Sequence, residues 1–99
     1  MIVERKMDFI RSILKELIEK KLVHGIVVTN IILVDSHPLF VDLYINIKRL
    51  GCEHKLRIAI DKIVIEDTDT MDIMIEILSA ISHKLGITYG AISIFDEED

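Results

Sequence analysis

The chain has 99 residues, of which 51% are hydrophobic and 29% charged, and its formal net charge is −5. This length suits a single domain, residues 1–99, with a packed core, and the acidic balance argues against a nucleic-acid binder, which needs a basic surface. The longest apolar run, residues 26–34, is about half of the roughly 20 residues that cross a bilayer, so we expect no membrane span and a cytoplasmic protein.

The composition also bears on stability. The chain contains twenty isoleucines, no glutamine and only two asparagines. Few thermolabile amides together with many charged residues are typical of thermophilic proteins, although an AT-rich genome would also favour isoleucine. We therefore expect a thermostable and acid-stable protein. A single cysteine, Cys52, excludes an internal disulfide.

The first expected helix covers residues 5–23, because its apolar side chains recur at helical spacing and form one stripe. The stripe consists of Met7, Ile10, Ile13, Leu14, Leu17, Ile18 and Leu22. His24 and Gly25 then supply a cation and a glycine suited to the end of a helix.

Three expected strands follow, at residues 26–34, 39–49 and 55–66. The first is rich in β-branched residues, and the second alternates strictly between apolar and more polar side chains. The third changes the parity of its apolar positions, which predicts a β-bulge near Asp61–Lys62. The segments "DSHP" (35–38) and "LGCEH" (50–54) are expected turns.

The second expected helix starts after a cap at Asp69 or Thr70 and ends at Gly86. Residues 87–95 are the fourth expected strand, and residues 96–99 an acidic tail. The order αβββαβ predicts an α+β fold, with a four-stranded mixed sheet and two helices packed on one face.

An exposed apolar patch is expected on the other face of this sheet, because strand 26–34 is apolar on both of its faces. The expected interface residues are Val27, Ile31, Leu33, Phe40 and Tyr44. A homodimer is the preferred explanation of this patch, and cover by a side chain or tail is the alternative.

Tracing the chain direction places the turn 50–54 and the ends of both helices at one basic end of the domain. Cys52 and His54, with His24 or His83, would offer zinc the nitrogen and sulfur ligands that it prefers. The alternative is that the two helix-end histidines favour the helix dipoles and that "GCEH" is an ordinary turn. We expect no cofactor; zinc is the one metal for which this end offers suitable ligands.

The other candidate sites have less support from the sequence. No oxyanion hole or orienting acid other than Glu53 accompanies a Cys52–His54 nucleophile. Asp35, His37 and Asp42 could bind a cation or be a solvated turn. The αβββα order also occurs in double-stranded-RNA-binding domains, but the acidic "EDTDTMD" replaces their basic second-helix start.

Two resemblances can be stated. The segments "HPLFVDLYINI" and "MDIMIEILSAISHKLGITYGAISIF" resemble the cytoplasmic domain of cation-efflux transporters, a ferredoxin-like dimeric module. The resemblance covers residues 7–47 and 71–95. That family has a metal-ligand histidine on its last strand, whereas "AISIF" has none, so metal binding is not carried over.

The chain as a whole is similar to small proteins of unknown function from filamentous viruses of hot, acidic archaeal habitats. This resemblance lies in the length, the segment "LVDSHPLFVDLYINIKRLG", the isoleucine content and the absence of glutamine. It implies a hyperstable protein of the host cytoplasm or the virion. We expect a non-enzymatic protein that acts through protein–protein association, and the alternative is a metal- or ligand-binding regulatory module at the His/Cys-rich end.

Overall fold

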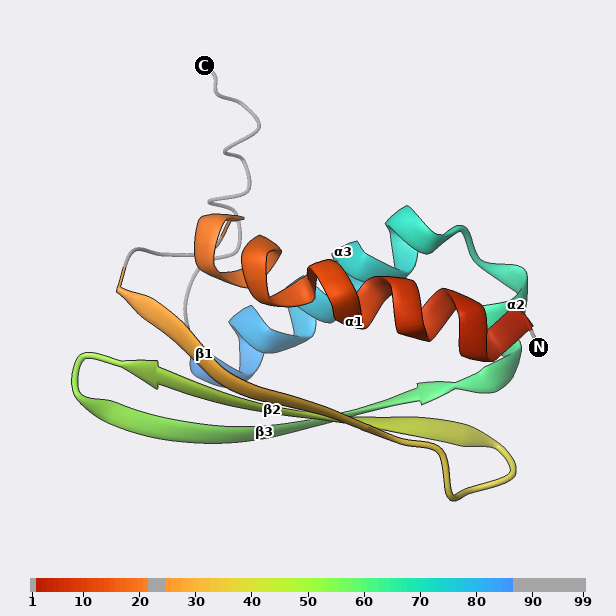
Figure 1. Cartoon of the computed structure of the whole chain (residues 1–99), viewed down its shortest axis with the longest axis horizontal. Coiled ribbons are helices and arrows are strands. Elements are labelled where there is room, and N and C mark those ends of the chain that lie inside the picture. Colours follow the sequence, from red (N-terminus) through yellow and green to blue (C-terminus); the bar gives the residue numbers. More distant parts are fainter. Residues whose placement is uncertain (1, 22–24, 87–99) are drawn as a thin grey trace, which may run out of the picture.

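The computed structural model describes residues 2–21 and 25–86. The elements are α1 (Ile2–Lys21), β1 (Ile26–Val34), β2 (Phe40–Arg49), β3 (Cys52–Asp61), α2 (Lys62–Asp67) and α3 (Thr70–Leu85). The strands form one antiparallel sheet in the order β1-β2-β3. Both long helices lie over the same face of this sheet, and α2 lies at the end where β3 leaves it (Figure 1).

The α+β class is confirmed, but the expected four-stranded mixed sheet with two helices is wrong. The described sheet is three-stranded and wholly antiparallel, and the described helices include a third, α2. The expected fourth strand, residues 87–95, lies outside the described residues. The expected layering holds in one respect, because the long helices share one face (Figure 1).

The parity change near Asp61 marks the start of α2 and not a β-bulge. Asp61 has extended backbone angles, and its carboxylate accepts a hydrogen bond from the Ile63 N–H at 2.8 Å. This is the geometry of an N-cap, which satisfies one of the free N–H groups at a helix start. The Lys62 N–H donates to the Leu39 carbonyl at 2.9 Å, so the helix start is also tied to the sheet.

The connection between β2 and β3 is a tight hairpin turn. Leu50 and Gly51 both have positive φ, 54° and 79°. Two central residues with positive φ are the pattern of a type I′ turn, whose twist matches that of the flanking strands. Cys52 and His54 therefore lie within β3 and not in the longer turn expected at residues 50–54.

A β-bulge is present, but in β1. Val28 pairs with Ile47 and Asn30 with Asn46, so Thr29 is an extra residue on its strand. The Thr29 hydroxyl donates to the Asn46 carbonyl at 3.2 Å. Because side chains alternate between faces along a strand, one extra residue moves every later side chain of β1 to the opposite face.

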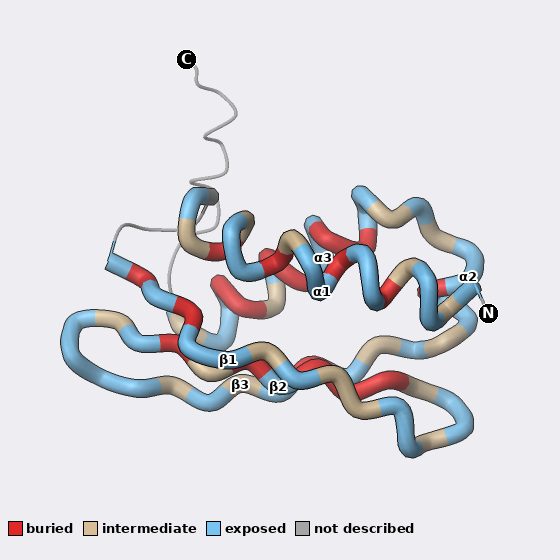
Figure 2. The backbone as a smooth tube through the Cα atoms, in the orientation of Figure 1, coloured by how far each residue is buried: buried red, intermediate tan, exposed pale blue. Residues whose placement is uncertain are grey.

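The hydrophobic core lies between the helices and the sheet, where the buried segments of α1, α3 and β2 face one another (Figure 2). Its fully buried members include Met7, Ile10, Leu14, Ile18, Leu43, Ile45, Ile47, Ile65, Ile73, Ile77 and Ile81. Burying one such side chain contributes about 1.5–3 kcal/mol. The stripe expected for the first helix supplies its core-facing side.

One lysine connects α1 to α2. The Lys6 ammonium donates to the carbonyls of Ile65, Glu66 and Thr68 at 2.8, 3.0 and 2.9 Å. The last carbonyls of a helix have no intrahelical partner and carry the negative end of the helix dipole. A cation from a distant part of the chain thus completes the end of α2, a role that "VERKMD" does not reveal.

Candidate functional site

The face of the sheet opposite the helices is uncovered among the described residues (Figure 1). Its apolar side chains come from β1 and β2. Val27, Ile32 and Tyr44 are 51%, 46% and 38% exposed, and Val34 and Phe40 are half-buried. We call these five residues the outer apolar patch. Ile32 and Tyr44 are direct cross-strand partners, whereas Val27 pairs with Lys48 and is separated from them by the Asn30–Asn46 pair.

The five residues expected at an interface lie on two faces. Val27, Phe40 and Tyr44 belong to the outer apolar patch. Ile31 and Leu33 instead pack against the core under the helices. The bulge at Thr29 is the reason, because it reverses the parity of the second half of β1. Ile32 and Val34 take their places on the outer face.

A polar cluster lies within the patch, because Asp42 stands between Phe40 and Tyr44 on β2 and Arg57 pairs with Tyr44 from β3. Asp42 is only 8% exposed, and its carboxylate accepts from the Arg57 guanidinium at 2.9 Å and 2.8 Å. The guanidinium lies 6.0 Å from the centre of the Phe40 ring, and the His37 ring stacks on Phe40 with centroids 3.9 Å apart. Asp42 and His37, which were considered for a cation, are thus engaged with an arginine and an aromatic ring. Asp35 pairs with Lys62 at 2.7 Å.

The open edge of β1 is partly closed by α1. The Val28 N–H donates to the Glu19 carboxylate at 2.8 Å, and Lys15 pairs with the same carboxylate at 3.0 Å. The backbone hydrogen bond, followed by the lysine, lowers the pKa of Glu19. An edge N–H bound by a side chain of its own chain is not available to another strand.

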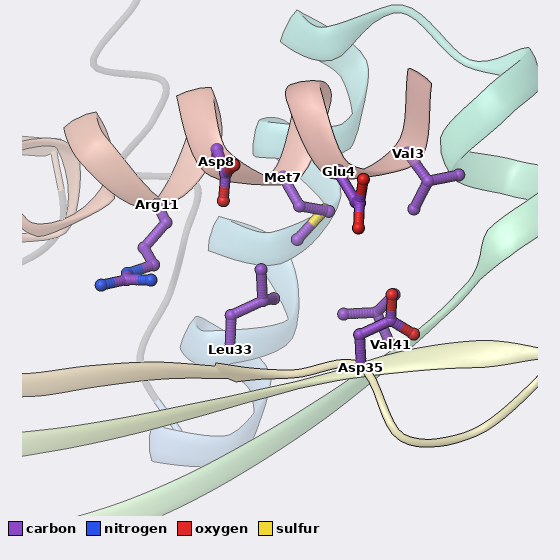
Figure 3. A pocket seen from close by; sticks show the side chains of 8 residues that line it. All are labelled: Val3, Glu4, Met7, Asp8, Arg11, Leu33, Asp35 and Val41. Atoms are coloured by element: carbon purple, nitrogen blue, oxygen red, sulfur yellow. The ribbon is translucent and has the colours of Figure 1, made fainter. Parts of the chain in front are cut away.

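A cavity of about 420 Å³ lies between the first half of α1 and the ends of β1 and β2. Figure 3 shows Met7 and Leu33 facing each other inside it, and Glu4 and Asp35 pointing toward each other across its opening. The walls are apolar and the rim is charged, with Asp8 and Arg11 on the helix side. Because Asp35 already has a lysine partner, we assign no ligand to this cavity.

A second hollow, of about 370 Å³, lies between β3 and α3. Its lining is mostly apolar, with one acidic residue from the strand and one from the helix. The residues are Ile58, Ala59, Ile60, Asp61, Val64, Ile73, Glu76, Ile77 and Ala80. We call this hollow the β3/α3 groove. It follows the outer edge of β3, which pairs with no further strand among residues 2–21 and 25–86.

The His/Cys-rich end has the expected course. The β2–β3 turn and the last turn of α3 lie toward the same end of the sheet, opposite α2 (Figure 1). Cys52 and His54 share the helix-facing side of β3, and His83 is exposed near the end of α3. Across residues 2–21 and 25–86, no three His, Cys, Asp or Glu side chains are placed to hold a metal ion together. His24 lies outside these ranges.

No protein-family model, curated protein or solved structure matches this chain. Within the part of the chain that the structure describes, no helix is long and apolar enough to cross a membrane. The two resemblances stay predictions, and the function is argued from the geometry alone.

Three features of these surfaces were not expected from the sequence. The start of α2 had a usable signal, because Asp61 directly precedes "KIVIED" and aspartate is a preferred N-cap. No sequence signal indicated the hydrogen bond of Glu19 to the β1 edge or the pairing of Asp42 with Arg57. These contacts join residues 9 and 15 positions apart on different elements, and local periodicity does not detect them.

Proposed function

We propose that this chain is a non-enzymatic association module, and that a second copy of the same chain covers the outer apolar patch. The observation that supports this is the one-sided arrangement of the helices. Three apolar side chains on this face, Val27, Ile32 and Tyr44, are between 38% and 51% exposed, and Ile32 and Tyr44 are direct cross-strand partners. An exposed apolar patch of this kind usually marks an interface.

A second copy fits because the patch is part of a sheet face. In a two-fold dimer the same surface is used by both partners, so it has to be complementary to itself. Two sheet faces satisfy this condition, and they pack about 10 Å apart with their strands roughly aligned. The Asp42–Arg57 pair lies within the patch, and the arginine compensates the charge of the buried Asp42 carboxylate.

The size of the face sets the expected affinity. Three strands about 4.8 Å apart and about 30 Å long offer a flat footprint of roughly 400 Å² per copy. Specific and stable interfaces bury about 800 Å² per partner. A dimer through this face alone is therefore weak, with a dissociation constant that we expect in the micromolar range or above.

Sedimentation velocity over a concentration series tests the proposal. Ile32→Lys places a charge in the middle of the outer apolar patch, and Leu50→Lys is the matched control, because Leu50 is 83% exposed in the hairpin turn. We expect Ile32→Lys to weaken association at least tenfold and Leu50→Lys to behave as the wild type. Equal association of all three proteins, with unchanged circular dichroism, would contradict the proposal.

A further inference from the structure

We infer that the β3/α3 side of the domain is a second, separate self-association surface, on which two copies pair through their β3 edges. This inference goes beyond the proposed function because it uses another surface and another contact. It would join two three-stranded sheets into one continuous sheet across a two-fold axis perpendicular to the sheet. Three features support this pairing: the β3 edge, which the described residues leave unpaired, the charges along this side, and the β3/α3 groove.

The two edges of the sheet differ. At the β1 edge, the Val28 N–H is held by the Glu19 carboxylate. At the β3 edge, β2 is the one strand that pairs with β3 within residues 2–21 and 25–86. Every second residue of an antiparallel edge strand points its N–H and C=O away from its neighbour. The β3 edge is therefore the better template for a further strand.

The charges on this side are arranged with opposite signs at its two ends. The outer face of β3 carries Glu53, Lys55 and Arg57 in its hairpin half, with a net charge of +1, and ends with Asp61. α3 runs in the opposite direction, with Asp72 and Glu76 in its first half and His83 and Lys84 in its last turn. Both elements are thus acidic at the end near α2 and basic at the hairpin end. A two-fold axis through the middle of this side brings each acidic end against a basic end of the second copy.

More than one strand register places opposite charges face to face. With Ala59 on the two-fold axis, Arg57 would lie opposite the partner's Asp61, but only residues 57–61 would pair and Arg57 already pairs with Asp42. The proposed register pairs the longer stretch, residues 55–61.

In the proposed register, Ile58 lies on the two-fold axis and Lys55 lies opposite the partner's Asp61 on the outer face. On the inner face, Ile60 lies opposite the partner's Leu56. Opposite charges and apolar pairs at directly facing positions each stabilise a sheet, whereas like charges destabilise it. In the neighbouring allowed register with Arg57 on the axis, two arginines would face each other.

The β3/α3 groove supplies the space for this pairing. Of its lining residues, Ile60 is partly exposed and Val64 is 45% exposed, whereas Ile58 and Ile77 belong to the buried core. α3 of the second copy would run antiparallel to α3 of the first along the same seam. The groove would then be closed by apolar side chains of both copies, and Glu76 would lie toward the basic last turn of the partner helix.

Charge exchange tests the register, and it is best made in the Ile32→Lys protein so that the outer apolar patch does not contribute. Lys55→Asp and Asp61→Lys each place like charges opposite one another twice per dimer, so we expect each to raise the dissociation constant about tenfold. The double variant restores opposite charges. Asp61→Lys also removes the hydrogen bond from the Ile63 N–H to the Asp61 carboxylate. The double variant is therefore compared with Asp61→Lys, because both proteins lack this hydrogen bond.

Sedimentation equilibrium gives the readout. The inference is supported when both single variants weaken the Ile32→Lys dimer and the double variant restores it to within about threefold. It is overturned when the Ile32→Lys protein stays monomeric up to about 1 mM, or when the double variant is no tighter than Asp61→Lys. The proposed function is tested separately, by comparing the dissociation constant of the wild type with that of the Ile32→Lys protein.

A disulfide provides a second measurement that does not depend on affinity. In a Cys52→Ser background, Ile58→Cys places two sulfurs at the two-fold axis, where the Cα atoms of facing residues are about 4.5–5.5 Å apart and can be bridged. Ala59→Cys is the matched control, one residue away on the other face. We expect fast crosslinking for residue 58 and slow crosslinking for residue 59, and the reverse order would overturn the register.

Discussion

The contact between Lys6 and the end of α2 predicts a large loss of stability from one conservative change. Lys6→Met keeps the length of the side chain but removes the ammonium that donates to the carbonyls of Ile65, Glu66 and Thr68. α2 spans only Lys62–Asp67, too short to be stable by itself. The change should therefore loosen α2 as well as its junction with α1.

The magnitude follows from the balance of three effects. Hydrogen bonds from a charged group contribute about 1.5–3 kcal/mol, and a buried carbonyl left without a partner costs about 1–3 kcal/mol. Fixing a lysine side chain offsets about 1.5–2 kcal/mol of this gain. We expect Lys6→Met to lower the free energy of unfolding by about 2 kcal/mol. For a domain of this size that corresponds to a fall in Tm of about 8–16 °C.

Urea unfolding followed by circular dichroism measures this loss. The matched control is Lys15→Met on the same helix, because Lys15 makes an exposed pair with Glu19 at 3.0 Å. Such a pair is worth about 0.3–0.5 kcal/mol. If Lys6→Met and Lys15→Met lower the free energy of unfolding equally, the three carbonyl contacts do not stabilise the fold and the reasoning is refuted.

Three further predictions concern single side chains. The Ser82 hydroxyl is buried without a hydrogen-bond partner in the described part of the chain, so Ser82→Ala should leave stability unchanged or raise it by up to about 1 kcal/mol, and a loss in thermal unfolding would contradict this. Because the pKa of Glu19 is lowered in the folded state, its contribution is present above the unfolded pKa of about 4.3 and is lost as pH falls through the folded pKa. The stability difference between wild type and Glu19→Gln in urea should therefore persist at pH 7 and 5 and shrink below about pH 4, and a constant difference would argue against it. Arg57→Met leaves the buried Asp42 carboxylate without its cation and should lower the free energy of unfolding by about 1–3 kcal/mol. This is less than for a fully buried pair, because the Arg57 side chain is 55% exposed. In an Asp42→Asn background the loss should fall below about 1 kcal/mol, and equal losses in both backgrounds would show that the two side chains are not coupled.

The elements that the sequence predicts well are those with a strong period. The stripe of α1 and the alternation of β2 each leave one consistent set of buried side chains, so their positions were right within a few residues. Strand β1 carries no such constraint. The run "IVVTNIILV" is apolar at both parities, and nothing in it indicates the extra residue at Thr29. The faces of Ile31 and Leu33 therefore could not be assigned without the register.

The start of α2 illustrates a different limit. A change of parity at Asp61 is compatible with a bulge or with a helix N-cap, and the sequence contains residues suited to each. The hydrogen bond from the Ile63 N–H to the Asp61 carboxylate decides between them. Contacts between distant elements, such as that of Lys6 with Thr68 across 62 positions, leave no local pattern at all.

The distribution of polar contacts indicates which surfaces remain for a partner. Lys6 completes the end of α2, Glu19 occupies a donor at the β1 edge, and Asp42 with Arg57 neutralises one end of the outer face. Each of these contacts satisfies a polar group, namely carbonyls, an edge N–H or a carboxylate. Without its partner, such a group would make burial costly or would be available to bind another strand. The outer apolar patch and the free edge of β3 carry no comparable closure among the described residues. A surface that is apolar or self-complementary in charge, and that the described residues leave open, is where association releases the most water at the least polar cost.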